Sequence, residues 1–156
     1  MPRIGLISDT HSLLRPEAVA ILRGSDHIIH AGDIGDMEVL TALRRIAPTT
    51  AVRGNNDRGN WASAIAETEV VEVGGVLIFV IHDIRDLGID PKTAGMHIVV
   101  SGHSHKPLIK ERNDVWFVNP GSAGARRFTL PISVAEIKVT GKTIKPRIIE
   151  LAVEDK

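Results

Sequence analysis

The chain contains no cysteine. This absence excludes a disulfide framework, a thiolate metal site and a cysteine nucleophile, and it fits a reducing compartment. Aromatic residues make up only 3% of the chain, which argues against the stacked aromatic platforms that bind single-stranded nucleic acid. The most strongly apolar run, Val76–Ile81, is far shorter than the roughly 20 residues of a membrane-spanning helix. We therefore expect no membrane partner.

The sequence also lacks an excess of charge, because 19 basic residues balance 19 acidic ones. A dedicated nucleic-acid binder usually carries a basic stripe, but the clustered basic residues here are the short pairs Arg44-Arg45 and Arg126-Arg127. We therefore expect a small substrate and no nucleic-acid partner. The segment Met1–Gly5 leads directly into an expected strand, so we expect no signal peptide and a cytoplasmic location.

The length of 156 residues and the hydrophobic content of 43% predict one globular domain, residues 1–156. The first half alternates expected strands with expected helices, one from Pro16 to about Arg23 and one from Met37 to Ala47. The second half is richer in strands, with a tight hairpin signal at Gly74-Gly75. This pattern predicts an α/β fold in which two stacked mixed β-sheets are flanked by helices.

Side chains that can bind metal follow five apolar runs that we interpret as buried strands. In an α/β sheet, side chains just beyond the carboxyl ends of neighbouring strands converge on one crevice. Seven nitrogen or oxygen donors would then meet at one edge, which is enough for two metal ions. These donors are Asp9, His11, Asp33, Asn55, His82, His103 and His105.

Each motif has an ordinary structural explanation when it stands alone. Asp9 and Asp33 are typical helix-capping residues, and Gly54–Asp57 is typical of a turn. A lone His82 at the end of a strand is more often a hydrogen-bonded core residue than a ligand. Two histidines that flank one residue in Gly102–His105 are an uncommon way to build a surface loop. The conjunction of these motifs at strand ends favours a functional site.

Taken together, the motifs resemble the signature of the metallophosphoesterase (calcineurin-like phosphoesterase) superfamily, whose implied fold is a four-layer αββα sandwich. The resemblance covers the chain from Ile4 to about Arg127. The compact length, together with Gly54–Asp57 and Asn119–Ser122, is similar to the small bacterial and archaeal phosphodiesterase branch. The motifs that carry the resemblance are Asp9-x-His11, Gly32-Asp33, Gly54-Asn55, His82 and Gly102-His103-Ser104-His105.

The resemblance implies a dinuclear metal site and the hydrolysis of small phosphate esters by in-line attack of a metal-bridging hydroxide. Donors without sulfur suit Mn, Fe, Zn, Ni or Co, and the resemblance favours manganese. It also implies catalytic roles for Asp33, Asn55 and His82. The implied ligand sets are Asp9, His11 and His105 for one metal, Asn55, His82 and His103 for the other, and Asp33 as the bridge.

The chain departs from the family pattern at Asn56, where many relatives have a histidine thought to protonate the leaving group. Asparagine cannot act as a general acid at neutral pH, and such an acid is commonly worth 10²–10⁴-fold. We therefore predict dependence on good leaving groups. Asp57 is expected to hold its loop or a ligand, while Asp83 either adds a carboxylate to the site or reshapes the turn.

The candidate substrate-binding residues are Asn56, Arg126 and Arg127. A pair of arginines suits phosphate, although a solvated basic pair explains Arg126 and Arg127 at least as well. The remaining histidines, His27, His30 and His97, lie in expected strands, which favours core positions or, for His30, support of Asp33.

The favoured function is a metal-dependent phosphodiesterase, and the resemblance also allows a homo-oligomer. The alternatives are a phosphomonoesterase or nucleotide hydrolase, and a protein-binding module similar to the retromer subunit Vps29. The complete set of donor residues favours the enzyme. The sequence argues against a Ser-His-Asp hydrolase, because Ser122 lies in Gly-Ser-Ala-Gly and the sequence has no Gly-x-Ser-x-Gly elbow.

Overall fold

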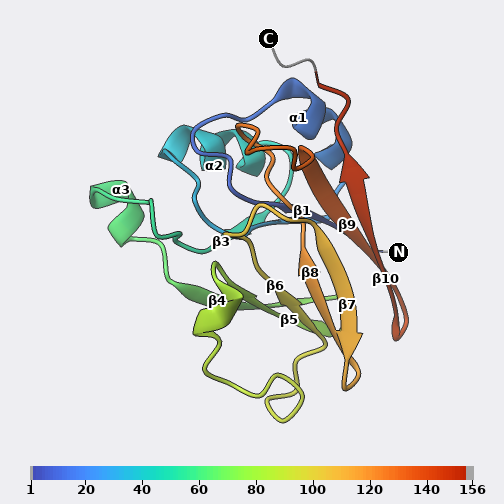
Figure 1. Ribbon diagram of the computed structural model, residues 1–156. Coiled ribbons are helices and arrows are strands. Elements are labelled where there is room, and N and C mark those ends of the chain that lie inside the picture. Colours follow the sequence, from blue (N-terminus) through green and yellow to red (C-terminus); the bar gives the residue numbers. More distant parts are fainter. Residues whose placement is uncertain (1, 154–156) are drawn as a thin grey trace.

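A computed structural model of the protein describes residues 2–153. Two five-stranded mixed sheets stack face to face (Figure 1). The first has the order β10-β9-β1-β2-β3, and its strands are β1 (Arg3–Ile7), β2 (His27–His30), β3 (Thr49–Ala51), β9 (Ser133–Thr140) and β10 (Thr143–Glu150). The second has the order β4-β5-β6-β8-β7, and its strands are β4 (Thr68–Val73), β5 (Val76–Ile81), β6 (Ile98–Val100), β7 (Leu108–Arg112) and β8 (Val115–Asn119).

The helices are α1 (Pro16–Leu22), α2 (Met37–Arg44) and the single-turn α3 (Asn60–Ser63), and a 3₁₀ turn follows β5 at Ile84–Asp86. In Figure 1, α1 and α2 lie above the first sheet, on the side away from the second sheet. None of the helices in residues 2–153 is long and apolar enough to cross a membrane. The two stacked mixed sheets that the sequence predicts are therefore confirmed, and helices α1 and α2 both lie beside the first sheet.

Helix α2 begins at Met37, as the sequence predicts, but ends earlier than predicted. The carboxylate of Asp36 caps its first turn by accepting a hydrogen bond of 2.9 Å from the Glu38 N–H. Asp36, and not Asp33, therefore caps this helix. The helix ends at Arg44 rather than at Ala47. Trp61 lies in α3.

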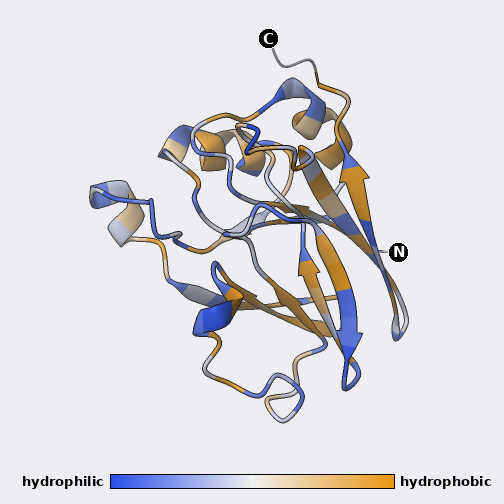
Figure 2. Cartoon of the chain, viewed as in Figure 1, coloured by the Kyte–Doolittle hydropathy of each residue, from blue (hydrophilic) through white to orange (hydrophobic). Residues whose placement is uncertain are grey.

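The main apolar core lies between the two sheets (Figure 2). Leu6 on β1 is fully buried there with Ile78 on β5, whereas Ile7 points to the opposite face. On that face Ile7 belongs to a second buried cluster with Leu22 of α1 and Leu40 of α2. The alternation follows from the two-residue period of a strand. Complete burial of such side chains contributes roughly 1.5–3 kcal/mol each.

The parallel strands of each sheet bring the loops that follow them to a common edge. Strands β1, β2 and β3 run parallel, as do β5, β6 and β8. Backbone hydrogen bonds then join the loops, because Asp9 N–H donates to the Gly32 carbonyl at 3.0 Å and Gly102 N–H donates to the His82 carbonyl at 2.9 Å. Donor side chains from distant segments are therefore held at one edge of the sandwich.

Candidate metal centre

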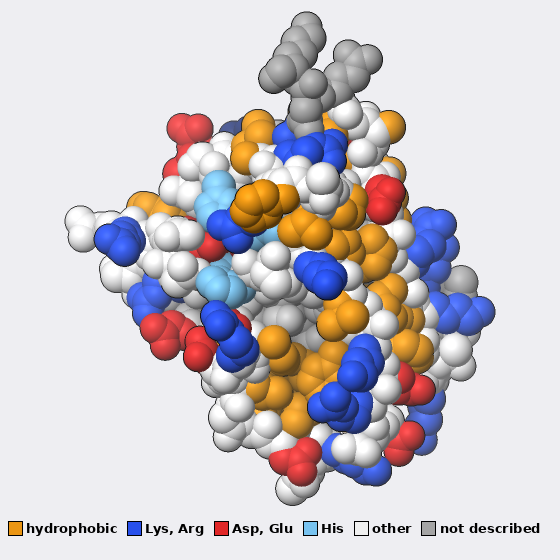
Figure 3. All heavy atoms as spheres, viewed as in Figure 1, with side chains coloured by type: hydrophobic (Ala, Val, Ile, Leu, Met, Phe, Trp, Pro, Cys, Tyr) orange, Lys and Arg blue, Asp and Glu red, His pale blue; other side chains and the backbone are white. Residues whose placement is uncertain are grey.

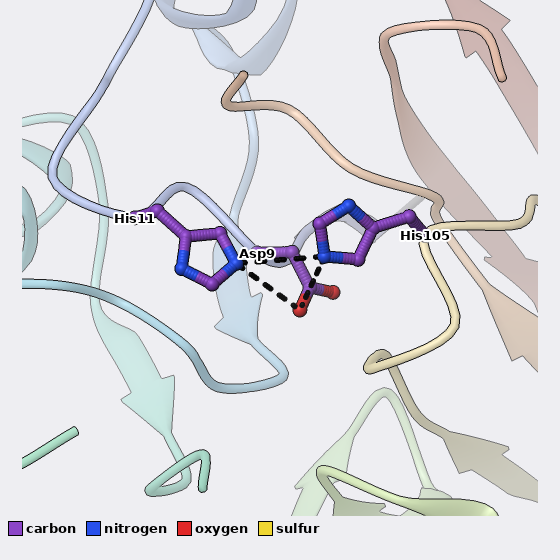
Figure 4. A group of neighbouring side chains, drawn as sticks. All are labelled: Asp9, His11 and His105. Atoms are coloured by element: carbon purple, nitrogen blue, oxygen red, sulfur yellow. Dashed lines mark hydrogen bonds and ion pairs between the residues drawn. The ribbon is translucent and has the colours of Figure 1, made fainter. Parts of the chain in front are cut away.

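The first cluster at this edge contains Asp9, His11 and His105, whose potential ligand atoms all lie within 4.8 Å of one another. Asp9 Oδ1 lies 3.4 Å from His105 Nε2 and 4.0 Å from His11 Nε2. The two imidazole nitrogens lie 3.4 Å apart. Figure 4 shows both rings directed toward the Asp9 carboxylate. The arrangement leaves three donor atoms facing one small space.

The second cluster contains Asp33, His82 and His103, again with potential ligand atoms within 4.8 Å of one another. His82 Nε2 lies 3.3 Å from Asp33 Oδ2. Asn55 adjoins this group, because its Oδ1 lies 3.1 Å from His103 Nδ1. The structure therefore brings Asn55 to the side of the site where the resemblance places it.

Asp33 connects the two clusters. Its Oδ2 lies 3.3 Å from His82 Nε2 in the second cluster and 3.7 Å from His11 Nε2 in the first. Asp9 Oδ1 also reaches across, at 3.9 Å from His82 Nε2. Asp33 is thus a carboxylate that lies between the two clusters.

The backbone at the site is unusual, because five of the candidate ligands adopt positive φ angles. These residues are Asp9 (54°), His11 (45°), Asp33 (55°), His103 (71°) and His105 (62°). A side chain with a Cβ in the left-handed region costs roughly 1–2 kcal/mol. Such strain persists where the surrounding structure enforces it, and it clusters at functional sites. The loops are therefore shaped to direct these side chains rather than to minimise backbone energy.

The buried carboxylate of Asp57 holds two of the site loops together. It accepts hydrogen bonds from the N–H groups of Gly54 at 2.8 Å, Ile34 at 3.2 Å and Gly35 at 3.0 Å. Gly54 must also lack a side chain, because a Cβ there would overlap the backbone and carboxylate of Asp33. The predicted loop-holding role of Asp57 is confirmed.

Several buried polar atoms at the site have no hydrogen-bond partner in the described chain, namely Asp9 Oδ1, His82 Nε2 and His105 Nδ1. Asp9 Oδ2, by contrast, accepts hydrogen bonds from the Ser8 hydroxyl and the His103 N–H. The His82 ring lies with Nδ1 2.7 Å from the Ala31 carbonyl. If Nδ1 carries the proton and donates it there, Nε2 presents a lone pair to the site. An unpaired buried carboxylate oxygen and an imidazole lone pair facing one space fit a divalent cation.

The electrostatics favour an ionised carboxylate at the centre. Burial alone would raise the pKa of Asp33, but His82, the Asn56 N–H and His11 together hold that pKa below its usual value. Burial alone would lower the pKa of His82, yet the Asp33 and Asp9 carboxylates raise it overall. The site is therefore organised around negative charge that a cation would neutralise.

The three candidate substrate-binding residues differ in their surroundings. Asn56 bonds to Asp33 through both its backbone N–H and its side-chain amide. Arg126 donates to the Leu130 carbonyl at 3.2 Å. Arg127 is exposed and lines a groove together with His103. Substrate contact by these residues stays a prediction.

The other histidines do not join the clusters. His30 is fully buried, and it bonds to the Thr10 hydroxyl at 3.0 Å and the Gly32 N–H at 3.1 Å rather than to Asp33. Burial lowers the pKa of His30 to about 4, so this imidazole is neutral at pH 7. His97 lies just before β6 and is exposed, so its predicted place in the core is wrong.

Two further residues contact the site loops. Arg85 Nη2 lies 3.2 Å from His103 Nε2 and 2.7 Å from the Asp83 carboxylate. Its hydrogen bonds hold the pKa of Asp83 at about 2. Asn119 donates to the Gly102 carbonyl and the Ser104 hydroxyl, which fixes the loop that carries His103. Sequence reasoning does not identify Arg85, because it belongs to no motif. Asn119 lies in the Asn119–Ser122 motif, but the neighbouring sequence does not show which groups its side chain binds.

A family model for the calcineurin-like phosphoesterase superfamily domain matches residues 2–142. A probable metallophosphoesterase of Methanothermobacter thermautotrophicus is 34% identical over 161 residues, covering 94% of this chain and 91% of the relative. A phosphodiesterase of Methanocaldococcus jannaschii is 29% identical over 139 residues, covering 76% and 82%. Among solved structures, Vps29 of Chaetomium thermophilum superposes with a TM-score of 0.78 at 21% identity and covers 97% of both chains, which shows a common fold.

Proposed function

Because the chain belongs to the calcineurin-like phosphoesterase superfamily, we propose that it is a metal-dependent phosphodiesterase that hydrolyses small phosphate esters. The observation that best supports this proposal is the pair of clusters joined by Asp33. Asp9 Oδ1 and His82 Nε2 support the same conclusion. Both atoms are buried without a hydrogen-bond partner in the described chain, and a divalent cation would serve as that partner.

The ligand assignment follows the two clusters. Two divalent ions, when bound, supply Lewis-acid stabilisation of the phosphate and an activated water. Manganese is our preferred ion, and Fe, Zn, Ni or Co also suit nitrogen and oxygen donors. Asp9, His11 and His105 would hold one ion, Asn55, His82 and His103 the other, and Asp33 both.

The chain's own residues shape the site around the ions and the substrate. Asp57 fixes the loops that carry Asp33 and Asn55. The guanidinium groups of Arg85 and Arg127 lie along the groove beside His103, where they can meet phosphate oxygens. Asn56 keeps the Asp33 carboxylate in one orientation and supplies no proton to a leaving group. We place this activity in the cytoplasm, in line with the absence of cysteine.

A screen of metal-reconstituted protein tests the proposal. The substrates are bis(p-nitrophenyl) phosphate, p-nitrophenyl phosphate and nucleoside monophosphates, each assayed with Mn, Fe, Zn, Ni or Co and with chelator-treated protein. We expect the diester to be hydrolysed fastest, and only with metal. Asp33→Ala should abolish the activity, whereas Asp36→Ala, which removes a carboxylate that caps α2, should retain it. A protein that binds metal but hydrolyses no diester with any ion would contradict the proposal and favour a Vps29-like binding module.

A further inference from the structure

A groove of about 710 Å³ opens beside His103 and continues along the outer face of the second sheet. His103, Ser104 and Asn119 line the end at the metal centre, and Phe117, Lys110 and Arg112 extend it over β7 and β8. In Figure 3, histidine side chains lie next to a hollow bordered by apolar and basic side chains. The groove therefore begins where a scissile phosphate would bind.

The register of β7 and β8 determines what faces this groove. Leu108 pairs with Asn119, Lys110 with Phe117, and Arg112 with Val115. Alternate residues of a strand share a face, and Ile109 packs on the inner core. Leu108, Lys110 and Arg112 therefore share the outer face. At about 3.4 Å per residue, Lys110 lies roughly 7 Å and Arg112 roughly 14 Å beyond Leu108.

The charged residues that line the groove are mostly basic. Its lining includes five basic residues, which are Arg85, Lys106, Lys110, Arg112 and Arg127. Asp83 is the single acidic residue that lines it within the described chain, and Arg85 already binds that carboxylate at 2.7 Å. Glu111 alternates with Lys110 and Arg112 and lies on the other face of its strand. The whole chain has a net charge of zero, so this concentration of positive charge is local.

The groove also has apolar surface, which a bare anion would not need. Leu108 lines the groove, and 51% of its surface is exposed. Phe117 is partly buried on the same face and packs with Val115 and Val99. An apolar surface that lies between a metal centre and a basic end suits a ligand that is ionic at both ends and flat or apolar in the middle.

We propose that this groove binds the organic part of the diester and that Lys110 and Arg112 bind a second phosphate on it. The substrate class is thus a nucleotide-type phosphodiester that carries a phosphate beyond the scissile one. This inference rests on the proposed phosphodiesterase function and adds the substrate class. The base or sugar lies against Leu108 and Phe117, and the scissile phosphate lies next to His103.

A matched pair of substrates tests the second-phosphate site. Thymidine 5′-(p-nitrophenyl phosphate) and its 3′-phosphorylated form have the same leaving group and the same ring. We expect the 3′-phosphate to raise kcat/KM roughly tenfold or more, mainly through a lower KM, as for a charge-assisted contact. The double substitution Lys110→Gln/Arg112→Gln should remove this gain. Lys145→Gln on β10, which removes a basic residue of the other sheet, should retain it. Leu108→Ser should weaken both substrates alike.

A binding measurement keeps the test independent of turnover. Calorimetry with thymidine 3′,5′-bisphosphate and thymidine 5′-monophosphate should show roughly tenfold tighter binding of the bisphosphate. The preference should shrink at high salt and be lost in the Lys110→Gln/Arg112→Gln protein. Equal affinities, or a preference that this protein keeps, would overturn the groove assignment even if diesters are hydrolysed. A preserved preference in wild-type protein that hydrolyses no diester would instead overturn the proposed function alone.

Discussion

The side-chain amide of Asn56 donates a hydrogen bond of 3.1 Å to Asp33 Oδ2, and the Asn56 backbone N–H donates one of 2.9 Å to Asp33 Oδ1. One residue therefore holds both oxygens of the proposed bridging carboxylate. Because asparagine has no acidic proton to transfer at neutral pH, Asn56 acts on Asp33 rather than as a proton donor.

The rate should fall steeply as the pKa of the leaving group rises, because nothing at Asn56 neutralises the departing oxygen. A series of substituted phenyl diesters, measured where chemistry is rate-limiting, gives the slope. Asn56→His should flatten the slope and favour poor leaving groups by up to the 10²–10⁴-fold of general acid catalysis. Asn56→Gln is the control that adds no acid. A shallow slope in the wild-type protein would show that another residue supplies the proton.

Asp33→Ala should lose metal and activity together, because the Asp33 carboxylate faces both clusters. Elemental analysis of manganese-loaded wild-type protein should find close to two ions per chain, and the variant should hold fewer. The activity loss should exceed the roughly 10–100-fold typical of residues that only support a ligand. Arg127→Ala should leave the metal content unchanged. Two retained ions and an unchanged rate in Asp33→Ala would refute the ligand assignment.

Asp57→Ala should destabilise the protein and weaken metal binding, because three backbone N–H groups lose their acceptor. Each unpaired buried donor costs about 1–3 kcal/mol. Urea unfolding should show a loss of about 3 kcal/mol or more, with a smaller loss for Asp57→Asn, which keeps one oxygen. Asp36→Ala should cost only about 1 kcal/mol, the value of an exposed helix cap. Equal stability of the Asp57→Ala and wild-type proteins would contradict this role.

His11→Gly should be more stable than His11→Ala in metal-free protein, because the φ angle of 45° strains any residue with a Cβ. The expected difference in the free energy of unfolding is about 1 kcal/mol. The same pair of substitutions at exposed His97, which is not among the positive-φ residues, should give the opposite order. Alanine and glycine of equal stability at residue 11 would mean that the metal-free loop relaxes to an unstrained conformation.

Glu136 should contribute stability that depends on pH. Burial alone would raise its pKa, but Arg3, Arg147 and Lys138 hold the pKa below the ordinary value of 4.5. A lowered pKa in the folded state gives stability that is present above the unfolded pKa and is lost as pH falls through the folded one. The difference in unfolding free energy between wild type and Glu136→Gln should therefore be larger at pH 7 than at pH 3.5. A difference that does not change with pH would contradict this prediction.

Features that depend on neighbouring residues could be predicted from the sequence. Gly74-Gly75 between two apolar runs predicts a hairpin, and in the structure β4 ends at Val73 and β5 begins at Val76. The position of each donor just after its strand is also local, so Asp9, His82 and His103 could be identified as candidates before their partners were known. The identities of the donors alone restrict the chemistry to metals that accept nitrogen and oxygen ligands.

Only the tertiary structure decided which donors meet. His11 and His105 are 94 positions apart in sequence, yet their Nε2 atoms lie 3.4 Å apart. Their contact depends on the order of strands in two sheets and on how those sheets stack. The same holds for Arg85, which belongs to no motif. It also holds for the outer face of β7, where Lys110 lies opposite Phe117 of β8 and lines the groove with it. Local patterns follow from the backbone periods of helices and strands. Contacts across the sandwich depend instead on packing between segments that lie far apart in the sequence, and no local pattern relates such segments to one another.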